Sequence, residues 1–423
     1  MTDPFDISAV DRAHLWHPYT QHGVGRPALP IARAEGAYLY DSSGRPIFDA
    51  ISSWWVTLHG HAHPAIASAI AEQAGTLEHV MFAGFTHEPA ARLAAALLER
   101  TPGNLCRVFL SDNGSTAVEV AVKMALQFWR NAGESRRLIV ALEHAYHGDT
   151  FGAMSLSERG LFTAAFSDHL FDVLRLPDPG TSDTGLVLDQ LLAERRREIA
   201  AVIVEPMLLG AGGMRVWSAD ALREIRDRTA RQGILMIADE VLTGFGRTGP
   251  LFACEHAGIA PDILCLSKGI TGGFLPLGAT LTTERIFERF LSVERRKALF
   301  HGHSYTANPL ACAAAIASWA LLDDTCAERR RLIERCHRRA IAEFARHAAV
   351  RAPRVLGTVL AFEIEAESGY LNPIGAELHA FALERGVLLR PLGNTVYLLP
   401  PYCATESDLD RAYDVLRAFL ALR

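Results

Sequence analysis

The sequence predicts an α/β protein with a large domain built on a mixed, mainly parallel sheet and a smaller α/β domain. Short apolar runs, among them residues 234–238 and 263–266, alternate with stretches that carry apolar residues at helical spacing. That alternation is typical of a parallel sheet with helices packed on its faces. The length of 423 residues, with 49% hydrophobic and 21% charged residues, suits a globular chain of two domains.

The large domain is expected to span residues 51–322. Loops rich in turn residues separate its predicted helices and strands. In chain order these are helix 64–77, helix 88–100, strand 107–110, a long helix after residue 116, strand 138–142, helix 185–199, strand 201–204, helix 219–232, strands 234–238 and 263–266, a return strand from residue 278, a charged helix within residues 284–297 and helix 310–322.

The two chain ends are expected to form the smaller domain, residues 323–423 with residues 1–50. Residues 36–50, GAYLYDSSGRPIFDA, predict a hairpin that turns at DSSG. From about residue 323 the composition changes to an arginine-rich helix, RRRLIERCHRRAIAEFARH, and strands and helices then alternate to the C-terminus. Because apolar residues recur through the arginine-rich stretch at helical spacing, it indicates a packed helix and not an RNA-binding arm.

Composition and charge exclude several classes of protein. A net charge of −6 and a pI near 6.3 give no reason to expect a nucleic-acid partner. The seven cysteines show no CxxC spacing, which indicates a reducing compartment and no structural zinc. No signal peptide is visible, and the longest apolar run, 310–322, is too short to span a bilayer. We therefore expect a cytoplasmic protein that binds neither nucleic acid nor membrane.

Two groups of histidines are possible metal ligands, but neither predicts a metal site. His14 and His17 have no third ligand nearby in the sequence, and the alternating His59, His61 and His63 are expected in a turn before helix 64–77. The glycine-rich loop LLGAGGMRVW lacks the GxGxxG spacing, and no GxxxxGK[ST] or GxSxG motif occurs. These observations argue against nicotinamide, nucleoside-triphosphate and serine-hydrolase chemistry.

Charged residues follow two neighbouring predicted strands at their carboxyl ends. Asp239 and Glu240 follow residues 234–238, and Lys268 follows residues 263–266. Ligands bind at this edge of an open α/β sheet. A buried lysine tends to lose its proton and become nucleophilic, and one such amine with one carboxylate is what pyridoxal phosphate requires. An ordinary Asp–Lys salt bridge is the alternative.

Three further features point to the same crevice. Gly114 and Ser115 lie between a predicted strand and the long helix, where free N–H groups hold an anion or where the same residues simply cap the helix. Tyr146 follows a strand end, where its ring either stacks on a flat cofactor or packs in the loop. Trp54 and Trp55 would point to opposite faces of a strand, so that one of them faces a pocket unless both pack in the core.

Two segments of the chain are similar to the signature of a known family. The strings ADEVLTGFGRTG and LSKGITGGFLPLG resemble those of the fold-type I, class III pyridoxal-phosphate aminotransferases, and the resemblance covers nearly the whole chain. It implies a transaminase that uses pyridoxal 5'-phosphate, with Lys268 as the lysine that binds the cofactor and Asp239 as the acid at the pyridine nitrogen. It also implies a homodimer with shared active sites.

The same resemblance implies a role for each remaining candidate residue. Cofactor contacts are implied for Gly114, Ser115, Tyr146, Asp239 and Lys268, and for His303 and Ser304 from the neighbouring subunit. Substrate contacts are implied for Tyr19, Trp54, Trp55, Tyr146, Lys268 and Arg390, and for Gly302 from the neighbouring subunit. Arg390 would bind the substrate carboxylate, and Glu205 would lie behind the cofactor.

Four peptides, HLWHPYTQ, SSWWVTLHGHAHP, EHAYHGDTFGAMS and RPLGNTVYLLPPY, resemble the branch of this family that works in biotin biosynthesis. That branch converts 8-amino-7-oxononanoate to 7,8-diaminononanoate, and S-adenosylmethionine is the expected amino donor. The loop Gly302-His303-Ser304 departs from the usual Gly-Pro-Thr and leaves lysine or another amino acid open as the donor. The alternatives are another class III ω-aminotransferase, a PLP-dependent decarboxylase or aminomutase, and a binding protein without turnover.

Overall fold

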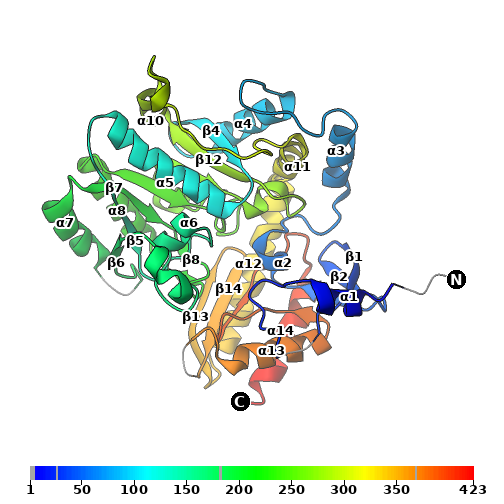
Figure 1. Ribbon diagram of the computed structural model, residues 1–423. Helices are drawn as coiled ribbons and strands as arrows, with labels where there is room; N and C mark the ends of the chain where they lie inside the picture. The colour runs from blue at the N-terminus through cyan, green and yellow to red at the C-terminus, as the bar shows by residue number, and fades with distance from the viewer. Residues whose placement is uncertain (1–4, 25–26, 181–182, 367–368) are drawn as a thin grey trace.

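A seven-stranded sheet forms the centre of the larger part of the molecule (Figure 1). The structure is a computed structural model and describes residues 5–24, 27–180, 183–366 and 369–423. Within these residues six strands of the sheet run in one direction, and β12 runs antiparallel to both of its neighbours. The predicted mixed α/β fold is confirmed. In sheet order the strands are β4 (Leu105–Ser111), β12 (Gly278–Thr283), β11 (Ile263–Leu266), β10 (Leu235–Asp239), β7 (Ile199–Val204), β5 (Leu138–Leu142) and β6 (Val173–Leu176).

Helices cover both faces of this sheet because its central strands are apolar at every position. β5 and β7 read LIVAL and IAAVIV, and all of their residues are buried. Successive side chains enter different apolar clusters. Val202 packs in the cluster that includes α7 (Thr184–Arg195) and α8 (Ala219–Arg231), whereas Ile203 packs in the cluster that includes α5 (Gly114–Asn131). Parallel strands need this burial on both faces.

The carboxyl ends of the parallel strands meet at one edge of the sheet. β10 ends at Asp239, β11 ends shortly before Lys268, and β4 leads through a two-residue turn into α5 at Gly114. The strand predicted at 263–266 is confirmed to the residue, and the strand predicted at 234–238 lies one residue further along. The sheet therefore brings Asp239, Lys268 and the start of α5 to the same edge.

The charged helix predicted within residues 284–297 is wrong. α10 (Glu284–Phe287) has four residues, and two short 3₁₀ turns, Glu288–Phe290 and Arg295–Lys297, follow it. Ile286 is the one buried residue in these three pieces. Without a continuous apolar face, the stretch gains too little from packing to hold a long helix.

The apolar helix α11 (Pro309–Ala320) packs inside the molecule, against α3 (Pro64–Ala74) and α4 (Glu88–Arg100). Among the described residues no single helix is long and apolar enough to cross a membrane, and α11 with α12 (Asp324–Phe344) matches only as a pair bent by 73°. The shorter elements of this part are α2 (Ser52–Trp55), α6 (Phe151–Leu156), a 3₁₀ turn at Ala164–His169, the hairpin of β8 (Leu208–Leu209) and β9 (Arg215–Val216), α9 (Cys254–Ala257) and a 3₁₀ turn at Lys268–Thr271.

The two chain ends lie side by side, with the blue N-terminal strands next to the orange and red C-terminal helices (Figure 1). The predicted hairpin is confirmed, and a C-terminal strand extends its sheet in parallel. The domain boundaries at residues 50 and 322 stay predictions. The elements are α1 (Ile7–His14), the sheet of β1 (Ile31–Glu35), β2 (Tyr38–Asp41), β3 (Pro46–Asp49) and β15 (Val387–Leu388), the sheet of β13 (Val350–Leu356), β14 (Val359–Ile364) and β16 (Thr395–Leu398), and the helices α12, α13 (Pro373–Glu384) and α14 (Glu406–Leu420).

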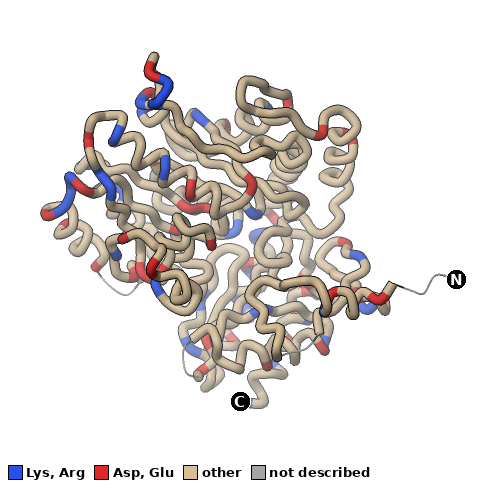
Figure 2. Tube along the Cα trace, in the orientation of Figure 1, with Lys and Arg blue, Asp and Glu red and all other residues tan. Residues whose placement is uncertain are grey.

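The arginine-rich helix α12 has acidic partners on the neighbouring helix α14, and Figure 2 shows basic and acidic residues interspersed over this end of the molecule. Arg339 pairs with Glu406 and Asp410, and in the opposite sense Glu343 pairs with Arg417. Paired charges between two packed helices agree with the interpretation of this stretch as a packed helix.

Candidate active site

A cavity of about 670 Å³ opens at the carboxyl edge of the seven-stranded sheet. Its walls come from the segments that follow five of the strands, together with residues just after β3. The lining residues are Trp55 and Val56, residues 112–115 after β4, residues 146–150 after β5, Glu205 and Ala211 after β7, Asp239, Val241 and Leu242 at β10, and Ser267, Lys268 and residues 273–277 after β11. The sheet edge that was predicted to bind a ligand is therefore hollow.

Lys268 supplies the amine of this cavity. Its backbone has φ +46°, in the left-handed region, and its Nζ lies 4.5 Å from the centre of the Trp55 ring. Burial lowers the pKa of Lys268 to about 8, although the nearby carboxyl groups of Asp239 and Glu205 raise it. In the described part of the chain no ion pair joins Lys268 to Asp239. The arrangement therefore favours a reactive amine over the salt bridge that was the alternative.

Asp239 is held in place by His147, a residue for which the sequence predicted no role. Asp239 is 5% exposed. Its Oδ2 lies 2.7 Å from Nδ1 of His147, and its Oδ1 accepts the N–H of Val241 at 3.1 Å. Since an ionised carboxylate can only accept, the imidazole donates. His147 also lines the cavity, and its buried Nε2 has no partner among the described residues.

Glu205 connects two walls of the cavity. One carboxylate oxygen accepts the N–H of Tyr146 at 2.9 Å, and the other accepts the N–H of Gly210 at 3.0 Å. Burial raises the pKa of Glu205 to about 7, against these hydrogen bonds, which lower it. Glu205 thus fixes the loop that carries Tyr146 and the start of the β8–β9 hairpin tip.

The N-terminus of α5 faces the cavity through Gly114 and Ser115. Asn113 is the N-cap and forms a capping box with Thr116, so Gly114 and Ser115 are not themselves the cap that the alternative proposed. The loop after β5 lies close against the start of α5, because a Cβ at Gly148 would lie 2.1 Å from Oγ of Ser115. The free N–H groups at the start of this 18-residue helix favour a bound anion, and the loop at Gly148 packs closely beside them.

Tyr19, Trp54 and Arg390 form an aromatic and basic group beside Tyr146. The hydroxyl of Tyr19 lies 3.3 Å from that of Tyr146 and donates to Asp149. The ring centres of Tyr19 and Trp54 are 5.5 Å apart, and the guanidinium of Arg390 lies 4.5 Å from the Trp54 ring. Long-range contacts therefore bring together three residues from distant parts of the sequence. Asp149 is a further neighbour that the sequence did not indicate.

The strand assumed for Trp54 and Trp55 is wrong, because residues 52–55 form a left-handed turn with φ between +45° and +77°. Left-handed backbone costs roughly 1–2 kcal/mol for each such residue. The surroundings offset this cost. Ser52 donates to the carbonyl of Leu399 at 2.7 Å, and the buried Arg247 donates to the carbonyl of Trp55 at 3.2 Å. The two rings still face different ways, with Trp55 at Lys268 and Trp54 at Arg390.

Gly302, His303 and Ser304 lie in the loop before α11, outside the residues that line the cavity of their own chain. Gly302 and Ser304 are exposed, and His303 donates its N–H to the hydroxyl of Thr306 at 3.0 Å. Their contact with the cofactor of a neighbouring subunit stays a prediction.

Known proteins match this chain over nearly its whole length. A family model described as aminotransferase class-III matches residues 19–420. The chain is 51% identical to the adenosylmethionine-8-amino-7-oxononanoate aminotransferase of Synechococcus elongatus, over 96% of this chain and 98% of that one. It is 41% identical to the protein of the same name from Mycobacterium leprae, over 96% and 94% of the two chains.

Two solved structures have the same fold over nearly the whole chain. The adenosylmethionine-8-amino-7-oxononanoate aminotransferase of Methanocaldococcus jannaschii matches with a TM-score of 0.94 and 33% identity, over 98% of both chains. An amine transaminase from an uncultivated Pseudomonas species, solved in its PLP-bound form, matches with a TM-score of 0.88 and 31% identity, over 97% and 98% of the two chains.

Proposed function

The chain belongs to the class-III aminotransferase family, as its sequence predicted, and we propose that it converts 8-amino-7-oxononanoate to 7,8-diaminononanoate with S-adenosylmethionine as the amino donor. The observation that carries the reaction class is the buried Lys268 amine, which lines the same cavity as Asp239. The assignment of the substrates rests on the name that the relatives share. A place in biotin biosynthesis follows from those substrates, and the cytoplasmic location stays a prediction.

We propose pyridoxal 5'-phosphate as the cofactor, since the cavity residues fit its parts. Lys268 would bind it covalently, Asp239 would face the pyridine nitrogen, and Tyr146 would cover the ring. Gly114 and Ser115 would take the phosphate at the start of α5. When bound, this cofactor supplies an electron sink for the electron pair left on the substrate carbon.

The residues of the chain then divide the proton chemistry between them. Lys268 Nζ takes the proton from the carbon that bears the donor amino group and later returns one to the carbonyl carbon of the acceptor. Its pKa of about 8 suits both tasks near neutral pH, because the amine exchanges protons readily in either direction. Asp239, fixed by His147, keeps a negative charge at one end of the cavity.

Two features support the acceptor, which is a long apolar chain that ends in a carboxylate. The rings of Tyr19 and Trp54 offer an apolar wall, and the Arg390 guanidinium beside Trp54 offers a fork for the carboxylate. The loop 302–304 would complete the site from a second copy of the chain. Exposed apolar side chains on nearby segments, Met81, Phe85, Phe300 and Tyr305, support this homodimer.

Arg390→Ala should weaken binding of the acceptor and leave cofactor binding nearly unchanged. Loss of one partner of a desolvated charge pair costs roughly 2–5 kcal/mol, so the acceptor KM should rise by about 30-fold or more. The carboxyl-methyl ester of the acceptor should bind the variant and the wild type alike. Arg385→Ala is the matched control, because Arg385 lies on the Phe381 ring just as Arg390 lies on the Trp54 ring, but next to residues of α14 and not beside Tyr19 and Trp54. An unchanged acceptor KM in Arg390→Ala would reject the pairing.

The amino donor is tested by a half-reaction. The enzyme with its pyridoxal cofactor is mixed with S-adenosylmethionine, lysine or another amino acid, and the visible absorbance of the cofactor is followed until 8-amino-7-oxononanoate is added. We expect S-adenosylmethionine to bleach that absorbance and the acceptor to restore it. If lysine bleaches the absorbance and S-adenosylmethionine does not, the assignment of the donor is wrong, and the assignment of the acceptor still holds. Restoration by pyruvate and not by 8-amino-7-oxononanoate would favour the ω-aminotransferase alternative.

A further inference from the structure

The tip of the β8–β9 hairpin, residues 210–214, forms part of the cavity wall. Ala211 lines the cavity, and Gly210 donates its N–H to Glu205, which in turn holds Tyr146. The tip lies directly on the segment that leads to Tyr146, since a Cβ at Gly212 would be 2.0 Å from the carbonyl oxygen of His144. A shift of the tip would therefore move the groups around Lys268.

The tip cannot hold this position through its own hydrogen bonds alone. Gly213 and Met214 have φ of +104° and +51°, in the left-handed region, and the two strands behind them have two residues each. A two-stranded hairpin of this size is at best marginally stable by itself. Its carbonyl groups must also find donors, because unpaired carbonyls away from water are costly.

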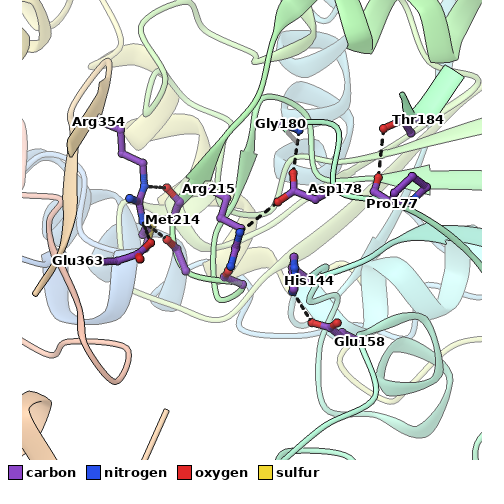
Figure 3. Close-up of polar contacts among 12 residues, drawn as sticks. His144, Glu158, Pro177, Asp178, Gly180, Thr184, Met214, Arg215, Arg354 and Glu363 are labelled. Carbon is purple, nitrogen blue, oxygen red and sulfur yellow. Dashed lines mark hydrogen bonds and ion pairs between the residues drawn. The ribbon is translucent and has the colours of Figure 1, made fainter. Parts of the chain in front are cut away.

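Arg354 supplies those donors from the other end of the chain (Figure 3). Its Nε donates to the carbonyl of Met214 at 2.7 Å and its Nη2 to the carbonyl of Gly213 at 2.5 Å, while Glu363 lies 3.4 Å from the same guanidinium. The Arg354 side chain is 14% exposed. It comes from β13, where the pairing with β14 shifts in register between Arg351 and Arg354.

A second arginine holds the opposite side of the tip. Nε of Arg215 donates to the carbonyl of Gly212 at 3.1 Å, and its Nη1 donates to Asp178, in the segment after β6, at 3.3 Å (Figure 3). Three successive carbonyls, those of residues 212, 213 and 214, therefore accept from two guanidinium groups. Arg215 joins the tip to the large sheet, and Arg354 joins it to the C-terminal sheet.

We propose that Arg354 is a positioning residue for amino transfer: it holds the hairpin tip against the Tyr146 segment, so that Glu205 and Tyr146 keep their places beside Lys268. The buried side chain of Met214 also packs against the C-terminal sheet, in the apolar cluster of Val359, Ala361 and Tyr397, and Arg354 adds the hydrogen bonds that hold the backbone of the tip. The kinetic part of this inference rests on the proposed function, whereas the structural part does not.

The experiment compares Arg354→Met with Arg351→Met by hydrogen exchange and by kinetics on the cofactor-loaded enzyme. Arg351 lies on the same strand but pairs with Glu365 at the surface, so its variant is the matched control. We expect Arg354→Met to speed amide exchange about tenfold at residues 208–216 and 144–149, and to lower kcat about tenfold, as hydrogen bonds to a charged group are lost. Arg351→Met should change neither quantity.

Arg354→Lys separates positioning from general stability. It keeps the positive charge but cannot reach two carbonyls with a rigid fork, so both effects should be intermediate. Faster exchange confined to β13 and β14, or a loosened hairpin with normal kcat, would overturn the inference. A wild-type chain that transfers no amino group would refute the proposed function and with it the kinetic part, and the exchange rates would still decide whether Arg354 holds the hairpin.

Discussion

Lys268→Ala should abolish amino transfer, with a loss of more than about 10⁴-fold in kcat, because in the proposed function this one side chain both binds the cofactor and moves the proton. The chain has three lysines, Lys123, Lys268 and Lys297, and Lys268 is the one at the cavity. Lys297→Ala is the matched control, since Lys297 pairs with Glu294 and does not line the cavity. Residual turnover in purified Lys268→Ala at more than a trace of the wild-type rate would refute the cofactor assignment.

A measurement that does not depend on turnover checks the same variant. Borohydride reduction of the loaded wild type should fix the cofactor mass on a single peptide, the one that contains Lys268. The variant should take up no such mass and show no visible absorbance of a lysine-bound cofactor. Label on Lys123 or Lys297 in the wild type would contradict the assignment directly.

The fold of Lys268→Ala should survive, because burial disfavours the charged amine that the substitution removes. Between the folded pKa of about 8 and the ordinary value of 10.5, the unfolded chain holds the lysine proton and the folded chain does not. The free energy of unfolding of the cofactor-free wild type should therefore rise with pH across this window. Chemical denaturation at several pH values should find a smaller rise in the variant.

Much of the part built on the seven-stranded sheet could be predicted, because its strands and helices are marked by local pattern. The apolar run at 263–266 gave its strand to the residue, and the parallel arrangement placed Asp239 and Lys268 at one edge of the sheet. Periodicity reports burial, and burial of whole strands between two layers of helices is what a parallel sheet requires. Local pattern alone was therefore enough to assign Asp239 and Lys268 to one site.

The remaining parts of the site depend on contacts between distant residues, which leave no local pattern. The left-handed turn at Trp54 and Trp55 is held by Leu399 and Arg247, and the Trp55 ring donates to Tyr397 at 3.0 Å. No periodicity in residues 52–55 encodes those partners. His147 lies beside Tyr146 in the same peptide, but only its approach to Asp239, 92 residues away, gives it a role.

Asp239→Asn should keep the fold and lose most of the chemistry. The amide keeps a carbonyl oxygen that can accept from His147, so the loop after β5 stays in place. It lacks the negative charge that would keep the ring nitrogen protonated. Removing one preorganised electrostatic group costs about 10²–10³ in kcat, and we expect a loss of at least this size. Cofactor binding through Lys268 should remain, which absorbance of the loaded variant would report.

Asp262→Asn is the matched control for this substitution. Asp262 is also buried, at the start of β11 and thus at the opposite edge of the sheet, where it pairs with Arg226 and accepts the N–H of Met236. Loss of its charge should reduce stability, since it removes the carboxylate that pairs with the half-buried Arg226, but should leave kcat unchanged. Asp239→Asn should show the reverse: a large loss of kcat with little change in the free energy of unfolding. If Asp239→Asn retains a near-normal kcat, Asp239 only supports the loop, and the charge at this end of the cavity has no part in the reaction.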